Sequence, residues 1–431
     1  MTATYQPLDQ TDGSGRSGCN FCKVLQCLCC LVVFTVLAGY GAFVYIGAKQ
    51  GSQQMLELTD SRNQYCTPGV DDVDMKNITY NIWWPGCGYV TSMDNLSDGC
   101  TEPCVDRNVM LEMNELNNKL PSMRISYSSR NSSDFDTVEL GGWWLPADED
   151  EFPGPRPRIV VQHGFQSNSN EFRQQFIAFI LRSLGYDVLL NNFRDHCYSD
   201  PSKEQIYQWG GAYPLDTLGA WDYAKDDPDS ILGGPVNASQ VGILGFSKGG
   251  FITLNVLGME GQIPGLWEDA SVEQPKTIFG YGFEQLLEGY GVGWLTAAVV
   301  DPAWWIILHN AQAAGVNLEE HTPATTLPLG PDTQRPVYMA HNIPDTTVPV
   351  SEAYGIKEIL EKYPEKYKIS DFWLLDDLCD ELNHAANHLS NYAEYKLRLC
   401  SFWADVFGKS NDDCAFRGNS TSKDTKKEVK L

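Results

Sequence analysis

The pattern of apolar positions predicts alternating strands and helices through the middle of the chain. Short apolar runs at 158–162, 241–244, 336–341 and 371–375 are typical of buried strands. The second run is followed by 250–257, which can form a helix without a breaker. Strands that alternate with helices indicate an α/β fold with a mostly parallel sheet.

The run at 241–244 leads into Gly245-Phe246-Ser247-Lys248-Gly249, a G-x-S-x-G pattern. Between a strand and a helix, this pattern forms a nucleophile elbow, a turn that exposes the serine at its tip. Glycines at both ends remove side chains where the two backbones nearly touch. The pattern alone is weak, and a Gly-rich turn with a solvated serine is the alternative. The flanking strand and helix favour Ser247 as a catalytic nucleophile.

A serine hydroxyl needs a base to take its proton. The chain has seven histidines, which are His163, His196, His309, His321, His341, His384 and His388. After a nucleophile elbow, the acid and then the histidine follow along the chain. Only His384 and His388 lie far enough beyond Ser247 to follow an acid-bearing strand. Asp345, in the loop after the strand at 336–341, is the predicted acid, since a carboxylate there can receive the second ring nitrogen of the base.

The strand at 158–162 ends in His163-Gly164-Phe165. A tetrahedral intermediate needs two backbone N–H donors, one after the nucleophile and one from this earlier loop. The predicted oxyanion hole therefore consists of Lys248 and Phe165. His163 precedes the nucleophile, and we interpret it as a buried or loop-shaping residue.

These features resemble the α/β-hydrolase superfamily over residues 123–408. The segments 125–129 and 137–146 resemble its opening hairpin, and 214–223 resembles the helix before the elbow strand. The segment 192–199 is similar to the arginine-aspartate-histidine-glycine stretch of the family, with Cys197 in place of the glycine. The resemblance implies a doubly wound, mostly parallel sheet with a short helical lid. It is nearest to acyl hydrolases, thioesterases and serine aminopeptidases.

The resemblance also separates the two late histidines. In the family, the catalytic histidine is commonly followed by Ala and then by a helix with a Tyr and a Phe, and His384-Ala385, Tyr395 and Phe402 match that spacing. The resemblance therefore implies His384 as the base, with His388 as the alternative. Both histidines could instead bind zinc from one helical face. No Glu follows His384 as in zinc proteases, so we expect neither a metal nor a cofactor.

The amino-terminal part predicts a membrane anchor. Residues 24–48 contain no charge and exceed the roughly 20 residues that a helix needs to cross a bilayer. The polar lead of 1–23 and the absence of a clean cleavage site favour an uncleaved transmembrane signal anchor. The orientation of this anchor is not decided by charge, because Arg16 and Lys23 before it are balanced by Lys49 and Arg62 after it.

Cysteines and sequons predict a cytosolic amino terminus and a lumenal body. Juxtamembrane candidates for S-palmitoylation are Cys19, Cys22, Cys27, Cys29 and Cys30, although the last two are also ordinary small residues of a span. The even number beyond the span fits disulfides, namely among Cys66, Cys87, Cys100, Cys104, Cys197, Cys379, Cys400 and Cys414. Candidate glycosylation sites are Asn77, Asn95, Asn131, Asn237 and Asn419.

The predicted organisation has five parts. A cytosolic segment at 1–23 precedes the anchor at 24–48. A Cys-rich lumenal extension at 49–122 then leads to the hydrolase domain at 123–408, and a polar tail at 409–431 is expected to be disordered. The net charge of −25 at pH 7, without a basic stripe, argues against a nucleic-acid partner.

The predicted lid at about 274–331 is rich in aromatic residues, which are Phe279, Tyr281, Phe283, Tyr290, Trp294, Trp304 and Trp305. They can line an acyl pocket or simply pack the lid onto the domain. Together they favour an apolar group over a charged peptide. Lys248 suggests a separate hypothesis: its amine could hold a substrate carboxylate or phosphate, or it could point away and pair with a carboxylate.

Three functions fit the sequence. The first is a membrane-anchored serine hydrolase that cleaves small-molecule or lipid esters or thioesters through Ser247, Asp345 and His384. The second is a serine peptidase on the same fold. The third is a non-catalytic receptor or adhesion module, against which the intact set of three residues argues.

Overall fold

The computed structural model describes residues 18–63, 66, 82–84, 88–90, 107–376, 384–410 and 414, and the side chains of 18–32, 82–84, 88–90 and 107 lie outside this description. Its centre is an eight-stranded sheet with the order β10-β9-β8-β7-β5-β6-β4-β3. The strands are β3 (Met123–Ser128), β4 (Glu139–Leu145), β5 (Arg158–Gln162), β6 (Asp187–Asn191), β7 (Val241–Phe246), β8 (Leu266–Asp269), β9 (Arg335–Asn342) and β10 (Tyr367–Leu375). A separate antiparallel pair consists of β1 (Ile82–Trp84) and β2 (Gly88–Val90).

The sheet is parallel except at β4, which runs antiparallel to both β3 and β6. The strands predicted from the apolar runs correspond to β5, β7, β9 and β10, and the predicted hairpin corresponds to β3 and β4, so these predictions are confirmed. The strands β6 and β8 were not singled out in the sequence.

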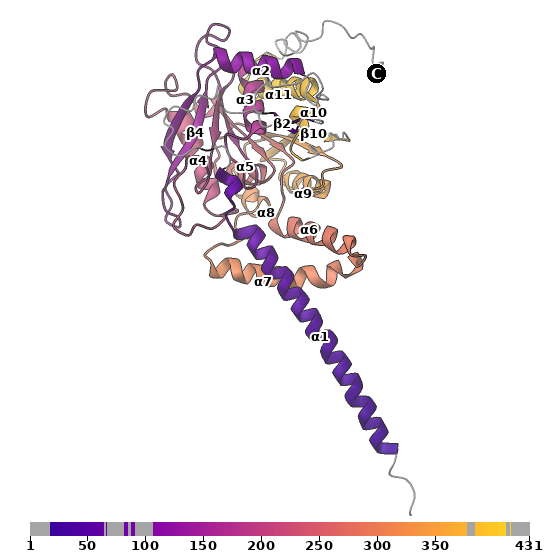
Figure 1. Cartoon of the computed structure of the whole chain (residues 1–431). Helices are drawn as coiled ribbons and strands as arrows, with labels where there is room; N and C mark the ends of the chain where they lie inside the picture. The colour runs from indigo at the N-terminus through magenta and orange to yellow at the C-terminus, as the bar shows by residue number, and fades with distance from the viewer. Residues whose placement is uncertain are drawn as a thin grey trace, which may run out of the picture.

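Side chains of each strand alternate between two apolar cores, as the period of a strand requires. Val160 and Ile243 face one core, while Val161 and Leu244 face the other. The first core is covered by α4 (Tyr213–Asp226), α5 (Lys248–Met259) and α9 (Val350–Glu361). The second is covered by α2 (Arg107–Lys119), α3 (Phe172–Ser183), α10 (Asn387–Ser390) and α11 (Tyr392–Phe407) (Figure 1). The carboxyl ends of the parallel strands therefore meet at one edge, between two helical layers.

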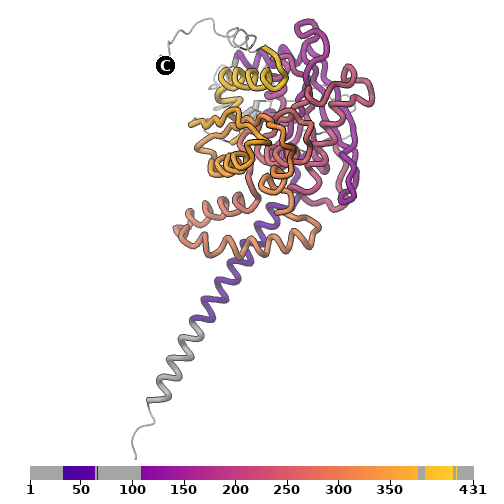
Figure 2. The backbone as a smooth tube through the Cα atoms, turned by 180° about the vertical axis from the view of Figure 1, so that it is seen from behind, coloured from indigo at the N-terminus to yellow at the C-terminus, as the bar shows by residue number. Residues whose placement is uncertain are grey.

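The segment between β8 and β9 corresponds to the range that was predicted as a lid. It contains α6 (Pro275–Gly289), η5 (Gly293–Leu295), α7 (Thr296–Ala313), α8 (Pro323–Thr326) and η6 (Leu327–Leu329). The short helix η4 (Ala238–Gln240) lies earlier, directly before β7. Figures 1 and 2 show α6 and α7 as an arm that stands off from the sheet, with α1 running across it.

Helix α1 (Gly18–Leu56) extends past the predicted end of the anchor at residue 48. Its last part packs against α7, and Figure 1 shows the rest projecting away from the body. Within the described part of the chain, no helix is both long enough and apolar enough to span a membrane. The side chains of 24–32, within the predicted span, lie outside the described residues.

The chain after α1 is tied to the body. The N–H of Thr59 donates to Oε1 of Gln166 at 3.1 Å, and Nε2 of Gln166 donates to the carbonyl oxygen of Glu57 at 2.7 Å. After η1 (Asp60–Asn63), a disulfide joins Cys66 to Cys197. The end of α1 is therefore fixed to the loop after β5 and to the loop after β6.

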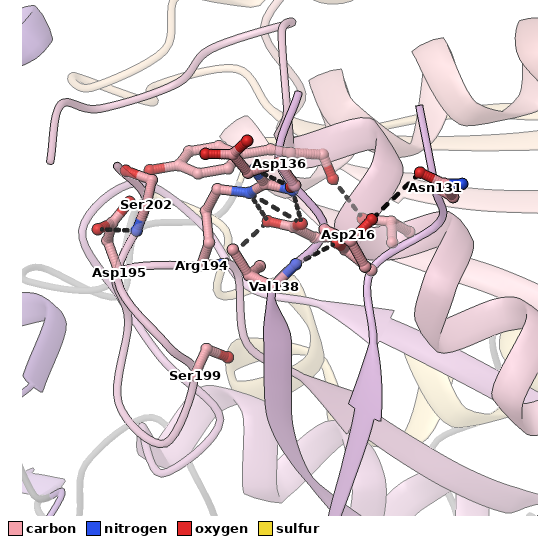
Figure 3. Close-up of polar contacts among 12 residues, drawn as sticks. Asn131, Asp136, Val138, Arg194, Asp195, Ser199, Ser202 and Asp216 are labelled. Atoms are coloured by element: carbon pink, nitrogen blue, oxygen red, sulfur yellow. Dashed lines mark hydrogen bonds and ion pairs between the residues drawn. The ribbon is translucent and has the colours of Figure 1, made fainter. Parts of the chain in front are cut away.

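The loop after β6 is held in turn by a buried ion pair (Figure 3). The guanidinium of Arg194 donates to Asp216 on α4, with Nη2 2.7 Å from Oδ1, and neither side chain is more than 2% exposed. The N–H of Arg194 also donates to Asp216, and Nη1 donates to the carbonyl oxygen of Asp136. Such a pair is stable in a dry interior only because its hydrogen bonds are nearly complete.

The described cysteines form two bridges, Cys66–Cys197 and Cys400–Cys414. The predicted disulfide cysteines Cys87, Cys100, Cys104 and Cys379 lie outside the described residues, as do the sequons at Asn77, Asn95 and Asn419. The side chains of Cys19, Cys22, Cys27, Cys29 and Cys30 also lie outside the description. The remaining sequons, at Asn131 and Asn237, are exposed.

Candidate active site

Ser247 lies in the turn between β7 and α5, in a strained conformation with φ 54° and ψ −124°. Its N–H donates to the carbonyl oxygen of Asp269 at 2.8 Å. A Cβ added at Gly249 would lie 2.4 Å from the carbonyl oxygen of Gln162, and one added at Gly245 would lie 2.5 Å from that of Gly249. Both glycines are thus required by backbone contacts, as expected for an elbow.

The predicted oxyanion donors flank this turn. A Cβ added at Gly164 would lie 3.3 Å from Cβ of Ser247, so the loop that contains Phe165 passes directly beside the serine. Helix α5 begins at Lys248, whose N–H belongs to the first helical turn and has no acceptor within the helix. Phe165, Ser247 and Lys248 line the same cavity. This arrangement can present two backbone donors to one oxygen atom.

Asp345 and His384 are in direct contact. Nδ1 of His384 lies 2.7 Å from Oδ2 of Asp345, whose side chain is fully buried. The other carboxylate oxygen accepts the N–H groups of Thr347 and Val348 at 2.8 and 2.9 Å. These bonds orient the imidazole so that Nε2 is the nitrogen left for proton transfer. Thr347 and Val348 line the cavity that also contains Ser247.

His388 has a different environment. It is fully buried on α10, with Nε2 3.2 Å from the carbonyl oxygen of Arg173 and its ring centroid 5.0 Å from that of Phe246. Burial lowers its pKa to about 3. His388 therefore contacts Arg173 and Phe246, whereas His384 contacts Asp345. Within the described residues, no group of His, Cys, Asp and Glu is arranged to hold a metal ion.

His163 is also buried, which agrees with its interpretation as a loop-shaping residue. Nδ1 lies 2.9 Å from the carbonyl oxygen of Gly164, and Nε2 accepts the N–H of Phe193 at 3.4 Å. Burial lowers the pKa of His163 to about 3, which keeps the ring neutral. It thereby joins the loop after β5 to the loop after β6.

Two buried carboxyl groups near the site were not predicted from the sequence. Asp269 and Glu268 end β8 and are buried, and burial raises the pKa of Asp269 well above its ordinary value. Oδ1 of Asp269 accepts a hydrogen bond from Nδ2 of Asn387 at 2.8 Å, so this carboxyl group contacts the start of α10, shortly after His384. His341 was assigned no role from the sequence, and its Nε2 lies 3.9 Å from Oδ2 of Asp345. The position of Glu268 and Asp269 at the end of a strand was the only feature of the sequence that could have indicated them.

The Lys248 side chain lies in an aromatic cage. Its Nζ is 3.5 Å from the ring centroid of Tyr207 and 3.8 Å from that of Tyr213, and it has no hydrogen-bond partner among the described residues. Phe193 and Trp209 complete the cage. The amine therefore has no carboxylate partner in the described part of the chain, and it is enclosed rather than presented to a substrate anion. The expected ion pair with a carboxylate is therefore absent from the described residues, and the hypothesis of an anionic substrate stays a prediction, which the enclosing rings disfavour.

Burial lowers the pKa of Lys248 well below its ordinary value of 10.5. Cation–π attraction to the rings opposes this shift, yet the side chain is only 1% exposed, so we expect the loss of hydration to dominate.

Ser247, Phe165 and Lys248 share a cavity of about 420 Å³ with residues of α1 and α6. The volume lies within the range of about 300–1,000 Å³ that is common for small-molecule sites. Except for Lys248, every lining side chain in the described residues is apolar or uncharged at neutral pH. A nucleophile, an oriented imidazole and two donors beside such a cavity can transfer an acyl group from an apolar substrate.

Comparison with known proteins gives one matching family, described as the alpha/beta hydrolase fold, over residues 157–272. Acylamino-acid-releasing enzyme 2 of Oryza sativa subsp. japonica is 29% identical over 122 residues, which cover 28% of this chain and 15% of that protein. The chain therefore corresponds to only a small part of this curated relative.

Solved structures give more distant similarities. The Pyrococcus furiosus esterase Pf2001 has 18% identity and a TM-score of 0.47, over 67% of this chain and 92% of its own. The Pyrococcus horikoshii acylaminoacyl peptidase has 14% identity and a TM-score of 0.45, over 69% of this chain and 44% of its own. Similarities of this size carry no information about the substrate.

If His384 is the predicted base of Ser247, replacement of His384 by Ala should lower kcat by about 10²–10⁴-fold, because the serine proton loses its acceptor. The matched control is His388→Phe, which keeps an aromatic ring among its aromatic neighbours and should retain turnover within a few-fold. Steady-state hydrolysis of an activated ester checks both variants. Loss of turnover in the His388 variant alone, with a folded protein by circular dichroism, would reverse the assignment.

Replacement of Lys248 by Met should stabilise the protein by about 1–3 kcal/mol near neutral pH, because it removes a buried donor without an acceptor. Because the pKa of Lys248 is lowered in the folded state, its burial reduces the free energy of unfolding most at pH values below the folded-state pKa. This reduction disappears as the pH rises from there towards 10.5. Thermal unfolding of both proteins across this pH range should show a gap that narrows with pH. A less stable Met variant would show that the rings stabilise an ammonium ion.

Proposed function

Because this chain has an α/β-hydrolase fold, we propose that it is a membrane-anchored serine hydrolase of carboxylic esters, thioesters or lipid acyl groups. The observation that carries the proposal is the contact between His384 and Asp345 beside the cavity that contains Ser247. A module used only for binding has no need of this pair. The proposed triad is therefore Ser247, His384 and Asp345.

In the proposed reaction, Nε2 of His384 accepts the proton of Ser247 as Oγ attacks the substrate carbonyl. The backbone N–H groups of Phe165 and Lys248 stabilise the resulting oxyanion. Collapse of this intermediate breaks the bond to the alcohol or thiol, which leaves with the proton from His384. Water then attacks the acyl-enzyme and gives a proton to His384. The second intermediate collapses with cleavage of the bond to Oγ of Ser247, which takes that proton back from His384, and the carboxylic acid is released. Asp345 stabilises the imidazolium in both halves of the reaction.

A serine peptidase is the second candidate, and the match to an acylamino-acid-releasing enzyme favours it. Both candidates share the same acyl-enzyme, so the leaving group distinguishes them. The cavity lining favours the first, because a charged peptide would meet no opposite charge among the described cavity-lining residues other than the enclosed amine of Lys248.

We propose the anchor at 24–48 from its lack of charge, with residues 1–23 in the cytosol and the remainder lumenal. Support for a lumenal body comes from the Cys66–Cys197 and Cys400–Cys414 bridges, since disulfides persist in oxidising compartments. The exposure of Asn131 and Asn237 leaves both sequons open to glycosylation. The cysteines at 19–30 stay candidates for palmitoylation.

Ser247→Ala should abolish labelling by a fluorophosphonate probe, since the probe forms a covalent bond with the activated Oγ. The matched control is Ser271→Ala, which removes another buried serine near α5 and should retain full labelling. Gel fluorescence of the purified full chain measures both. Labelling that persists in the Ser247 variant would refute the proposed nucleophile.

The topology makes a separate prediction. Protein produced in a eukaryotic secretory host should gain mobility on a denaturing gel after treatment with an amidase that removes N-glycans. Asn131→Gln combined with Asn237→Gln should reduce this shift, because both sites are exposed. A full chain whose mobility the enzyme does not change would contradict a lumenal body.

A further inference from the structure

The cavity beside Ser247 has walls from two distant parts of the chain. One wall comes from the lid helix α6 and includes Phe279 and Phe283. Another part of the wall comes from the end of α1 and includes Gly47 and Gly51. The helix proposed as the membrane anchor thus continues into the candidate active site.

Small residues allow α1 to approach the lid this closely. A Cβ added at Gly51 would lie 2.4 Å from the ring of Phe279, and one added at Gly47 would lie 2.7 Å from the ring of Phe283. Nδ2 of Asn310 on α7 also donates to Oγ of Ser52 at 3.1 Å. The position of α1 therefore determines where the lid aromatics lie, and with them the shape of the cavity.

The part of the same helix that projects from the body exposes apolar side chains. Exposed side chains of α1 include Val33, Phe34, Val36, Leu37, Tyr45 and Ile46. The lid arm beside it adds Tyr290, Trp294 and Trp305, which are 76%, 79% and 69% exposed. Large exposed apolar side chains next to a helical stretch without charge, residues 24–48, are typical of contact with a lipid surface, where Trp and Tyr favour the interface.

We propose that the cavity binds the aliphatic acyl chain of a membrane-lipid ester and that α1 forms one wall of this acyl site. This inference rests on the proposed function, because Ser247 must attack the carbonyl at one end of the chain. The cavity has no carboxylate or guanidinium in its described lining, and the amine of Lys248 is enclosed by aromatic rings. An alkyl chain can fill such a space without leaving a charge unpaired.

Selection of the acyl chain then depends on α1 as well as on the lid. A substrate that resides in the bilayer would enter between α1 and α6, where the exposed apolar surface meets the cavity. A water-soluble acetyl ester needs none of this surface. The enzyme should therefore prefer long acyl chains when the leaving group is held constant.

The first test fills the cavity from α6. Gly282 lines the cavity, and a Cβ there would meet no atom within 4 Å. Gly282→Leu places an alkyl group in this space and should lower kcat/KM for an octanoyl ester by about tenfold or more relative to the acetyl ester of the same alcohol. Gly289→Leu is the matched control, since Gly289 also has open space on α6 but does not line the cavity.

The second test moves the wall from α1. Gly51→Ala should displace Phe279 or α1, because the added methyl group overlaps the ring. It should change the ratio of octanoyl to acetyl turnover, whereas Gly41→Ala on the same helix, with no atom within 4 Å of an added Cβ, should leave the ratio unchanged. All variants are measured as full chains in neutral phospholipid vesicles.

Fluorophosphonate labelling of Ser247 separates the two levels of inference. A wild-type protein that neither reacts with the probe nor hydrolyses any ester refutes the proposed function. A labelled wild-type protein in which Gly282→Leu lowers octanoyl and acetyl turnover equally refutes the acyl site alone. An unchanged ratio in Gly51→Ala, with the expected loss in Gly282→Leu, leaves the acyl site but removes α1 as its wall.

Discussion

The close contact between the start of α5 and the end of β5 is the constraint on which the candidate site depends. A single carbon atom at Gly249 would overlap the carbonyl oxygens of Gln162 and His163. This contact holds Ser247 in a conformation that is costly for a residue with a side chain. It also sets the first N–H of α5 beside the loop of Gly164 and Phe165. Nucleophile and predicted oxyanion donors are thus positioned by one backbone crossing.

The amino-terminal part of the chain is integrated with this crossing. Gln166, next to the predicted donor Phe165, exchanges two hydrogen bonds with Thr59 and Glu57 just after α1. The Cys66–Cys197 bridge fixes the same segment to the loop that carries Arg194. A movement of α1 would therefore strain the donor loop as well as the cavity wall. In physical terms, the proposed anchor and the proposed site form one packed unit.

Lys248 illustrates how tertiary packing overrides the expectation for an isolated charge. Beside a serine at a helix start, a lysine suggests a binding site for an anion. Its four-carbon stem instead carries the amine into a cage that includes Tyr207 and Tyr213. Tyr213 begins α4 and Tyr207 lies in the loop before it, and no local pattern indicates that either ring will contact Lys248. Because burial lowers the pKa of Lys248, the positive charge near Ser247 is smaller than a lysine at this position implies.

The sequence by itself determined the strands at β5, β7, β9 and β10 and the elbow, because local periodicity and glycine spacing encode them. The order Ser247, Asp345, His384 followed from motif order and family resemblance. Only the tertiary structure decided that His388 is enclosed by aromatic rings, that Asp269 accepts a hydrogen bond from the start of α10 and that Lys248 is surrounded by aromatic rings. The contact between Gly51 and Phe279 is likewise visible only in the tertiary structure. Such contacts join residues far apart in the chain, and no local pattern records which distant side chains will share a cavity.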